Sequence, residues 1–205
     1  MTASRRIDRS VLAVAREIDA RGLVIGTTGN VSARVAGDIR ITPTRQPYAC
    51  LRGRDLVTVA LDGTVLRGCR PPSRETPLHL AVYRRRVDVG GVVHTHSPYA
   101  TAWGMTGHPL NPGLEDQSYY EIGVVSCLCG NHDGGTGQPR DLGHALGSSN
   151  AVLLGNHGVL AVGRDPAAAL LVARVVEHMA CVAHAQITMR LAAEPHRGAV
   201  FDMSN

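Results

Sequence analysis

The chain has 205 residues, of which 44% are hydrophobic and 19% charged, and its formal net charge is +4 at pH 7. This length supports one large domain with a substantial core and is short for two. The basic residues are scattered and aromatic residues make up only 3%, so we expect no nucleic-acid partner. No uninterrupted apolar run reaches the roughly 18 residues that cross a bilayer, so we expect no membrane partner either.

Two residue types narrow the chemistry further. The chain has no lysine, which excludes a Schiff-base or P-loop lysine because a guanidinium is not an amine nucleophile. Carbon–carbon chemistry would then need an electron sink other than a lysine, and a metal is the obvious candidate. The five cysteines make an odd number, and the N-terminus lacks a secretory signal pattern, so we expect free buried thiols and a cytoplasmic location. The pair Cys127 and Cys129 reads as part of a strand near a turn rather than as a zinc site.

The first third of the chain predicts one helix and two hairpins. Residues 4–21 form a charged amphipathic helix that Gly22 ends. Residues 30–44 read as a hairpin that turns at Gly37-Asp38, and residues 56–66 read as a second hairpin with Asp62-Gly63 as its turn.

Helices and strands alternate in the remainder. Residues 73–87 predict a helix with Ser73 as its N-cap, and residues 90–104 predict a strand that runs into a short helix. Residues 150–163 read as strand, turn and strand. A long helix over 166–193 follows the cap Asp165. This order indicates an α/β or α+β sandwich in one domain over residues 1–205, with a loose tail after about residue 193.

A histidine pair carries the first chemical signal. His94 and His96 lie two positions apart in an apolar, β-branched run that predicts a strand, so both side chains project from one face and could bind one ion, although two polar residues on a solvent-facing side of the strand would give the same pattern. His157, in a glycine-flanked turn between two apolar strands, is the best third ligand, although turn chemistry alone also explains it. His79 reads as a core-edge or surface histidine. Glu75 is an acid/base candidate near that strand, although an acidic residue in a first helical turn also complements the helix dipole.

Small-residue loops predict an anion site. Residues 26–32 offer free backbone N–H groups and an Asn amide, and residues 41–45 and 72–75 add hydroxyls, Arg45, Arg74 and a helix N-terminus. Each loop alone is a routine turn. Together they are typical of a phosphate pocket made of backbone amides and guanidinium groups.

The ordered set "GTTGNVSAR", "ITPT", "PSRETPLHLAVY", "VVHTHSPYATAW" and "LLGNHGVLAVG" resembles the class II aldolase/adducin family over about residues 10–190. The resemblance implies a three-layer α/β/α sandwich with a central, mostly antiparallel sheet. It also implies zinc or another divalent metal held by His94, His96 and His157, and Glu75 as the catalytic acid/base. A substrate phosphate would be held by residues at the positions Gly29, Asn30, Thr44, Arg45, Ser73 and Arg74. The family's sugar-phosphate aldolases are homotetramers with active sites completed at subunit interfaces.

The implied activity is that of a metal-dependent aldehyde-lyase. The metal would stabilise the enediolate left when a fuculose- or ribulose-like ketose 1-phosphate is cleaved to dihydroxyacetone phosphate and an aldehyde. Two positions depart from the fuculose-phosphate aldolase pattern, since Arg45 replaces a glycine and Arg74 replaces a serine. Both add charge beside the anion site, which is compatible with phosphate or with another acidic group. The proton-transfer residue expected in segment 108–140 is Asp116, Tyr119 or Tyr120.

Other members of the family leave alternatives open. The L-ribulose 5-phosphate 4-epimerase branch is the second reading, although it carries an aspartate at the position of Glu75. Dehydratase and decarboxylase members share the same metal site. An adducin-like scaffold without catalysis is disfavoured, because a scaffold has no reason to keep three histidines and Glu75 together.

Overall fold

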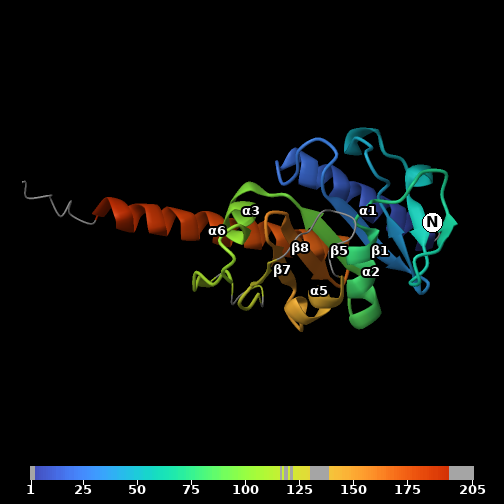
Figure 1. Cartoon of the computed structure of the whole chain (residues 1–205). Helices are drawn as coiled ribbons and strands as arrows, with labels where there is room; N and C mark the ends of the chain where they lie inside the picture. Colours follow the sequence, from blue (N-terminus) through green and yellow to red (C-terminus); the bar gives the residue numbers. More distant parts are fainter. Residues whose placement is uncertain (1–2, 116, 118–119, 121, 130–138, 194–205) are drawn as a thin grey trace, which may run out of the picture.

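The computed structural model describes residues 3–115, 117, 120, 122–129 and 139–193. These residues form one eight-stranded sheet with helices on both of its faces (Figure 1). The strands are β1 (Asn30–Val35), β2 (Asp38–Ile41), β3 (Val57–Val59), β4 (Val65–Arg67), β5 (Gly91–Thr95), β6 (Ser126–Leu128), β7 (Ala151–Leu154) and β8 (Gly158–Gly163). The helices are α1 (Ala3–Ala20), α2 (Thr76–Arg85), α3 (Pro98–Gly104), α5 (Pro139–Leu146) and α6 (Pro166–Ala193), with short 3₁₀ turns η1 (Tyr48–Cys50) and η2 (Gly53–Asp55).

The sheet runs in the order β4-β3-β2-β1-β5-β8-β7-β6. Every neighbouring pair is antiparallel except β6 and β7, which are parallel. The predicted three-layer sandwich with a mostly antiparallel sheet is therefore confirmed. The central pair β1 and β5 places Asn30 directly opposite His94, so the loops and strands that carry the expected site meet in the middle of the sheet.

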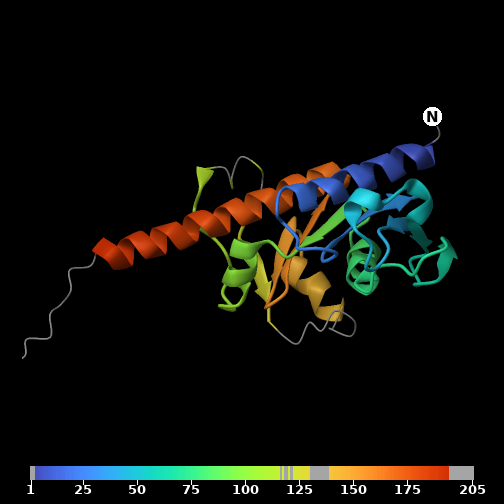
Figure 2. The same cartoon turned by 90° about the horizontal axis from the view of Figure 1, so that it is seen from above.

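Each face of the sheet has its own core. Val31, Val93 and Val159 contribute to a cluster with α1, α3 and α6, whereas Val92 and Leu160 contribute to a second cluster with α2 and α5. Adjacent strand residues thus enter opposite clusters, as the two-residue period of a strand requires. Figure 2 shows α1 and α6 lying over one face, with α2 and α5 on the other.

The first hairpin turns one residue earlier than expected. Val35 pairs with Asp38, so the two loop residues are Ala36 and Gly37, and the predicted turn at Gly37-Asp38 is wrong. Both loop residues have positive φ angles, 46° and 94°. A two-residue loop with two positive φ angles matches the right-handed twist of the flanking strands, which explains why the turn settles there.

Helix α2 begins three residues later than the sequence predicted, and its N-cap is Glu75 rather than Ser73. The physical reason is Pro77, which has no N–H. A start at Ser73 would have placed this proline beyond the first turn, where a helical hydrogen bond would be missing. The observed start puts it in the first turn instead. Ser73 accepts a hydrogen bond from the Glu75 backbone N–H at 3.2 Å and so shapes the turn that leads into the helix.

Helix α6 passes beyond the body of the molecule at its C-terminal end (Figures 1 and 2). It is the one described helix whose length and composition would allow it to cross a membrane, and 56% of its most apolar window is buried inside the structure. Its boundaries agree with the predicted helix over 166–193, and Asp165 caps it by accepting a hydrogen bond from the Ala168 N–H at 2.8 Å. The tail expected to be loose lies outside the described residues.

All five cysteines are free, as expected, but they are not buried. Cys50, Cys69 and Cys129 are exposed, and Cys127 and Cys181 are partly exposed. The expectation of buried thiols is wrong because these positions fall at turns, in or just after the edge strand β6, and on α6. Cys127 packs against one core cluster but stays partly exposed.

A three-histidine cluster beside an anion cleft

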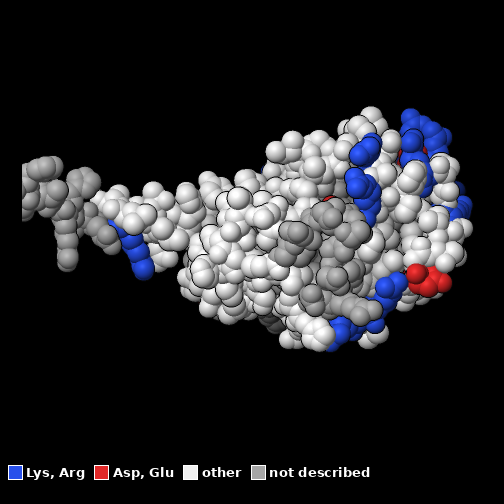
Figure 3. Space-filling model, viewed as in Figure 1, with Lys and Arg blue, Asp and Glu red and all other residues white. Residues whose placement is uncertain are grey.

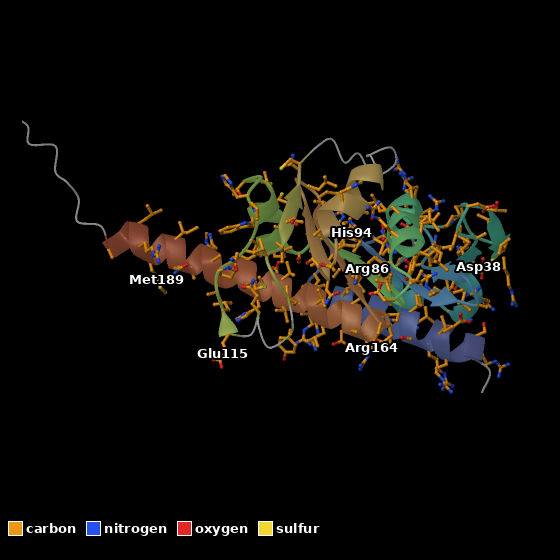
Figure 4. All side chains as sticks on the ribbon, turned by 90° about the horizontal axis from the view of Figure 1, so that it is seen from below. Asp38, Arg86, His94, Glu115, Arg164 and Met189 are labelled. Carbon is orange, nitrogen blue, oxygen red and sulfur yellow. The ribbon has the colours of Figure 1, made fainter. Side chains whose placement is uncertain are left out.

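His94 and His96 reach the same point from the end of β5. His94 is the fourth residue of the strand and is fully buried, and His96 follows just after the strand ends. Their Nε2 atoms lie 3.0 Å apart. The two-residue spacing therefore does what strand geometry predicted, and Figure 4 shows His94 in the interior of the molecule.

His157 joins them from the turn between β7 and β8. The turn holds Asn156 and Gly158 at φ angles of 61° and 91°. A Cβ atom on Gly158 would stand 2.0 Å from the Thr95 carbonyl oxygen, so only glycine lets this turn approach the end of β5. The three imidazole rings consequently form a closed group, with centroids 4.8 to 4.9 Å apart.

Glu75 completes the group with a carboxylate. Its Oε2 lies 3.3 Å from His94 Nε2 and its Oε1 lies 3.2 Å from His157 Nε2. The carboxylate makes no capping hydrogen bond to its own helix. The helix-dipole explanation of this residue therefore does not describe where its side chain goes.

The donor set fits a divalent metal ion. One ligand atom from each of Glu75, His94, His96 and His157 lies within 4.8 Å of the others. Ligands about 2.0–2.2 Å from a tetrahedral zinc ion would themselves be about 3.3 Å apart, which is close to the separations of 3.0, 3.2 and 3.3 Å observed. Three imidazoles and one carboxylate also match the ligand types that zinc takes in catalytic sites.

The tautomer of His94 points to the same conclusion. Its Nδ1 lies 3.0 Å from the Val159 carbonyl oxygen, and a carbonyl can only accept, so Nδ1 carries the proton. Nε2 then presents a lone pair toward His96 and Glu75, as an imidazole that binds a metal ion must. Among the described residues nothing accepts a hydrogen bond from His157 Nδ1, which is buried.

Burial keeps two of these imidazoles in the neutral form that binds metals. It lowers the pKa of His94, against the opposing effect of Glu75. Burial and then the nearby His94 and His157 lower the pKa of His96 to about 4. Burial alone would raise the pKa of Glu75, but its interactions with His94, His157 and Asn30 outweigh that effect, and the net pKa lies well below its usual range. At neutral pH His94 and His96 are thus neutral imidazoles beside the ionised carboxylate of Glu75.

A cleft of about 170 Å³ opens beside the cluster. All six residues predicted to bind the substrate line it together with Glu75 and His96; they are Gly29, Asn30, Thr44, Arg45, Ser73 and Arg74. Arg45 and Arg74 are exposed, so their guanidinium groups are free to meet an anion that enters from solvent. Arg45 holds a φ angle of 53°, a left-handed conformation that costs a non-glycine residue energy.

Of the three residues expected to transfer a proton in segment 108–140, the structure describes only Tyr120, which does not line this cleft. Asp116 and Tyr119 lie outside the described residues, and Tyr120 is 37% exposed. The described residues near them line a different cleft of about 510 Å³, which includes Gln117 and Ile122 and shares no residue with the first.

Sequence reasoning missed three buried polar residues behind Glu75. His79, predicted to lie at the core edge or surface, is fully buried, as are Ser32 and nearly all of Tyr83. The reason is that α2 packs with this side against β1. The signal available in the sequence was the helical four-residue spacing of His79 and Tyr83 together with the two-residue spacing of Asn30 and Ser32.

Comparisons with known proteins agree with this geometry. A family model described as the class II aldolase and adducin N-terminal domain matches residues 9–184. L-ribulose-5-phosphate 4-epimerase UlaF from Salmonella paratyphi B is 32% identical over 194 residues, which covers 87% of this chain and 84% of that protein. Several solved structures share the fold, and two of them are named here. An L-fuculose 1-phosphate aldolase has a TM-score of 0.83 at 25% identity, covering 92% of this chain and 89% of its own. The L-fuculose-1-phosphate aldolase from Thermus thermophilus has a TM-score of 0.81 at 26% identity, covering 91% and 98%.

Proposed function

Because the chain belongs to the class II aldolase and adducin family, we propose that it is a metal-dependent aldolase that cleaves a ketose 1-phosphate. The products would be dihydroxyacetone phosphate and an aldehyde. The observation that carries the proposal is the position of Glu75, whose carboxylate lies within 3.3 Å of two imidazoles and also lines the cleft that holds Arg45 and Arg74. The residues that we propose for proton transfer, for metal binding and for anion binding are therefore neighbours.

His94, His96 and His157 would hold the metal, and zinc is the ion we propose from their donor types. When bound, such an ion supplies a Lewis acid that stabilises negative charge developing on the substrate oxygens. This supplies the electron sink that a lysine would otherwise provide, and the chain has no lysine.

The residues of the cleft would fix the substrate at its anionic end. Arg45 and Arg74 bring two positive charges, and Thr44 and Ser73 bring hydroxyl donors. Guanidinium groups bind phosphate oxygens in pairs, which orients as well as attracts. With the phosphate held there, the carbon beside the carbonyl comes next to Glu75, which moves a proton to or from that carbon.

A sugar-phosphate epimerase is the second candidate, and the 32% identity to L-ribulose-5-phosphate 4-epimerase UlaF favours it. The two candidates differ in what leaves the cleft. An aldolase releases two carbon fragments, whereas an epimerase returns the intact sugar phosphate with one centre inverted.

The experiment is a product assay on purified enzyme with measured metal content. The enzyme is incubated with L-fuculose 1-phosphate, L-ribulose 1-phosphate and L-ribulose 5-phosphate, and dihydroxyacetone phosphate is followed with a coupled dehydrogenase. We expect it from a ketose 1-phosphate, about one metal per chain, and loss of activity with a chelator. Epimerised pentose alone would establish the second candidate, and a metal-free active enzyme would refute both.

Matched arginine variants test the anion site separately. Arg45→Ala and Arg74→Ala should each raise KM for the phosphorylated substrate by about tenfold, because each removes a charge-assisted hydrogen bond. Arg164→Ala is the control, since it removes a guanidinium that is 89% exposed and lies outside the cleft. Unchanged KM in both cleft variants would mean that the anion binds elsewhere.

We further propose that the enzyme is a cytoplasmic homotetramer with active sites completed between subunits. The part of α6 that extends from the body carries exposed Ile187, Met189 and Leu191, and Figure 3 shows almost no charge on the visible side of it. Met189 lies far along this extension from His94 (Figure 4). Apolar surface of this kind is typical of subunit contacts. Five free thiols suit a reducing compartment. Light scattering should give four chains per particle; a monomer would contradict the proposal.

A further inference from the structure

We propose that His79 is a positioning residue, which fixes the side-chain amide of Asn30 and through it the carboxylate of Glu75. His79 does not itself line the anion cleft, and its printed hydrogen bonds go to Ser32 and to Asn30, which does line that cleft. This inference rests on the proposed function in one respect, namely that Glu75 is the catalytic acid/base. The direction of the hydrogen bonds behind Glu75 can be measured in protein that has no substrate and no enzymatic activity.

The four side chains behind Glu75 come together because of the two-residue period of strand β1 and the four-residue spacing of helix α2. Asn30 and Ser32 are two residues apart on β1 and face α2, whereas Val31 faces the opposite core. His79 and Tyr83 are four residues apart on α2 and therefore share one face of that helix. Where the two elements pack, the four side chains interleave, and each of them is at most 2% exposed.

The hydrogen bonds between them form a chain that ends on Glu75. The Tyr83 hydroxyl lies 2.9 Å from Ser32 Oγ, and Ser32 Oγ lies 2.7 Å from His79 Nδ1. His79 Nε2 then contacts Asn30 Oδ1, and Asn30 Nδ2 donates to Glu75 Oε2.

Only one direction satisfies every group in this chain. An ionised carboxylate only accepts, so the amide nitrogen of Asn30 must face Glu75 and its oxygen must face His79. That oxygen requires a proton on His79 Nε2, which leaves a lone pair on Nδ1 to accept from the Ser32 hydroxyl. The Ser32 oxygen in turn accepts from Tyr83. All four donors thus point toward Glu75.

The environment holds this arrangement in place. Burial and the nearby His94 lower the pKa of His79 to about 3, with Glu75 acting in the opposite direction. Burial also raises the pKa of Tyr83 above its usual range, although Ser32 and the guanidinium of Arg34 oppose the shift. At neutral pH His79 therefore stays neutral and Tyr83 keeps its proton. A neutral His79 has a single N–H donor, and the orientation that Glu75 imposes on Asn30 assigns this proton to Nε2.

The test compares two substitutions of His79 with a control on the same helix. His79→Leu removes the donor to Asn30, and His79→Gln retains an amide N–H at the position of Nε2. Val82→Ala is the control, because Val82 is fully buried on α2 but lies in the apolar cluster. We expect kcat of His79→Leu to fall about 10- to 100-fold with KM within about twofold, His79→Gln to recover most of that loss, and Val82→Ala to keep wild-type kcat.

Equal losses of kcat in His79→Leu and His79→Gln, or a loss in Val82→Ala of the same size, would show that His79 acts only through folding and would overturn the inference.

A second measurement does not depend on activity. In protein labelled with ¹⁵N-histidine, the signals lost in His79→Gln identify His79, and their shifts report which nitrogen is protonated. We expect a proton on Nε2 and no titration between pH 5 and 8. A proton on Nδ1, or a titrating ring, would overturn the inference whatever the enzyme does. The expected tautomer in a protein that turns over neither substrate class would instead refute only the proposed function.

Discussion

Gly158→Ala should damage the metal centre without touching a metal ligand. The residue sits at a φ angle of 91°, where an L-residue pays about 1–2 kcal/mol. The added Cβ would also stand 2.0 Å from the Thr95 carbonyl oxygen and 3.0 Å from the His96 Cα. Both atoms belong to backbone, which cannot rotate away as a flexible side chain does, so relief requires the turn to move off β5.

The expected cost follows from these two terms. Overpacking against fixed atoms typically costs about 1–3 kcal/mol, so Gly158→Ala should lower the free energy of unfolding by about 2–5 kcal/mol in total. Because the displaced turn carries His157, zinc affinity should also fall by about tenfold or more, as it does when the support of a ligand is disturbed.

Gly22→Ala is the matched control. Gly22 also has a positive φ angle, 67°, but a Cβ there would meet nothing within 4 Å. It should pay only the conformational cost of about 1–2 kcal/mol and bind zinc as the wild type does. Urea denaturation of metal-free protein and competition with a chromophoric chelator measure the two quantities. Equal destabilisation of both variants with unchanged zinc affinity would refute the close-approach argument.

Three further outcomes are expected. Glu75→Gln should keep its metal but lower kcat by about 10²–10⁴-fold; near-normal turnover with full metal content would reduce Glu75 to a cleft-lining carboxylate. Arg45→Gly should relieve the left-handed φ of 53° and leave the free energy of unfolding unchanged or up to about 1 kcal/mol higher, while KM rises; a clear loss of stability would contradict this reading of Arg45. The metal-free protein should lose stability as pH falls from about 6.5, the unfolded value for histidine, to about 3, the pKa of folded His79. In that pH range the unfolded state binds one more proton than the folded state, because His79 is protonated only after unfolding. The free energy of unfolding of His79→Gln should therefore depend on pH less steeply than that of the wild type, by up to about 1.4 kcal/mol per pH unit. Parallel slopes in the two proteins would contradict the burial of a neutral His79.

Much of this molecule follows from local sequence patterns. The apolar, β-branched run around His94 and His96 predicts a strand that projects both imidazoles from one side, and in the structure their Nε2 atoms lie 3.0 Å apart. The amphipathic pattern of the first helix and the apolar pattern after Asp165 predict α1 and α6 nearly to the residue. These features depend on periods of 2 and 3.6 residues, which the backbone fixes within a single element.

The errors arose where a neighbouring constraint decided the outcome. The start of α2 was set by Pro77 rather than by the favourable cap at Ser73. The first hairpin turned at Ala36-Gly37 because the strand register, and not the strongest turn residue, fixed the loop. Neither the N-cap of α2 nor the turn of the first hairpin can be predicted from its own segment alone. The alternative positions for the cap and for the turn differ in free energy by only about 1 kcal/mol.

The sequence by itself indicated the residues of the candidate site, namely His94, His96, His157, Glu75 and the small-residue loops, and it showed that the chain has no lysine. Only the tertiary structure decided that His79 lies behind Glu75 rather than at the surface. It also decided that Gly158 brings His157 within reach of β5, and that Arg45 and Arg74 share one cleft. Those relations join residues far apart in the chain, through a sheet order in which β1, β5 and β8 are neighbours. The periodicity of a helix or strand defines which of its faces a side chain occupies. The residues that this face contacts depend on how the helices and strands pack, and a local sequence pattern does not contain that information.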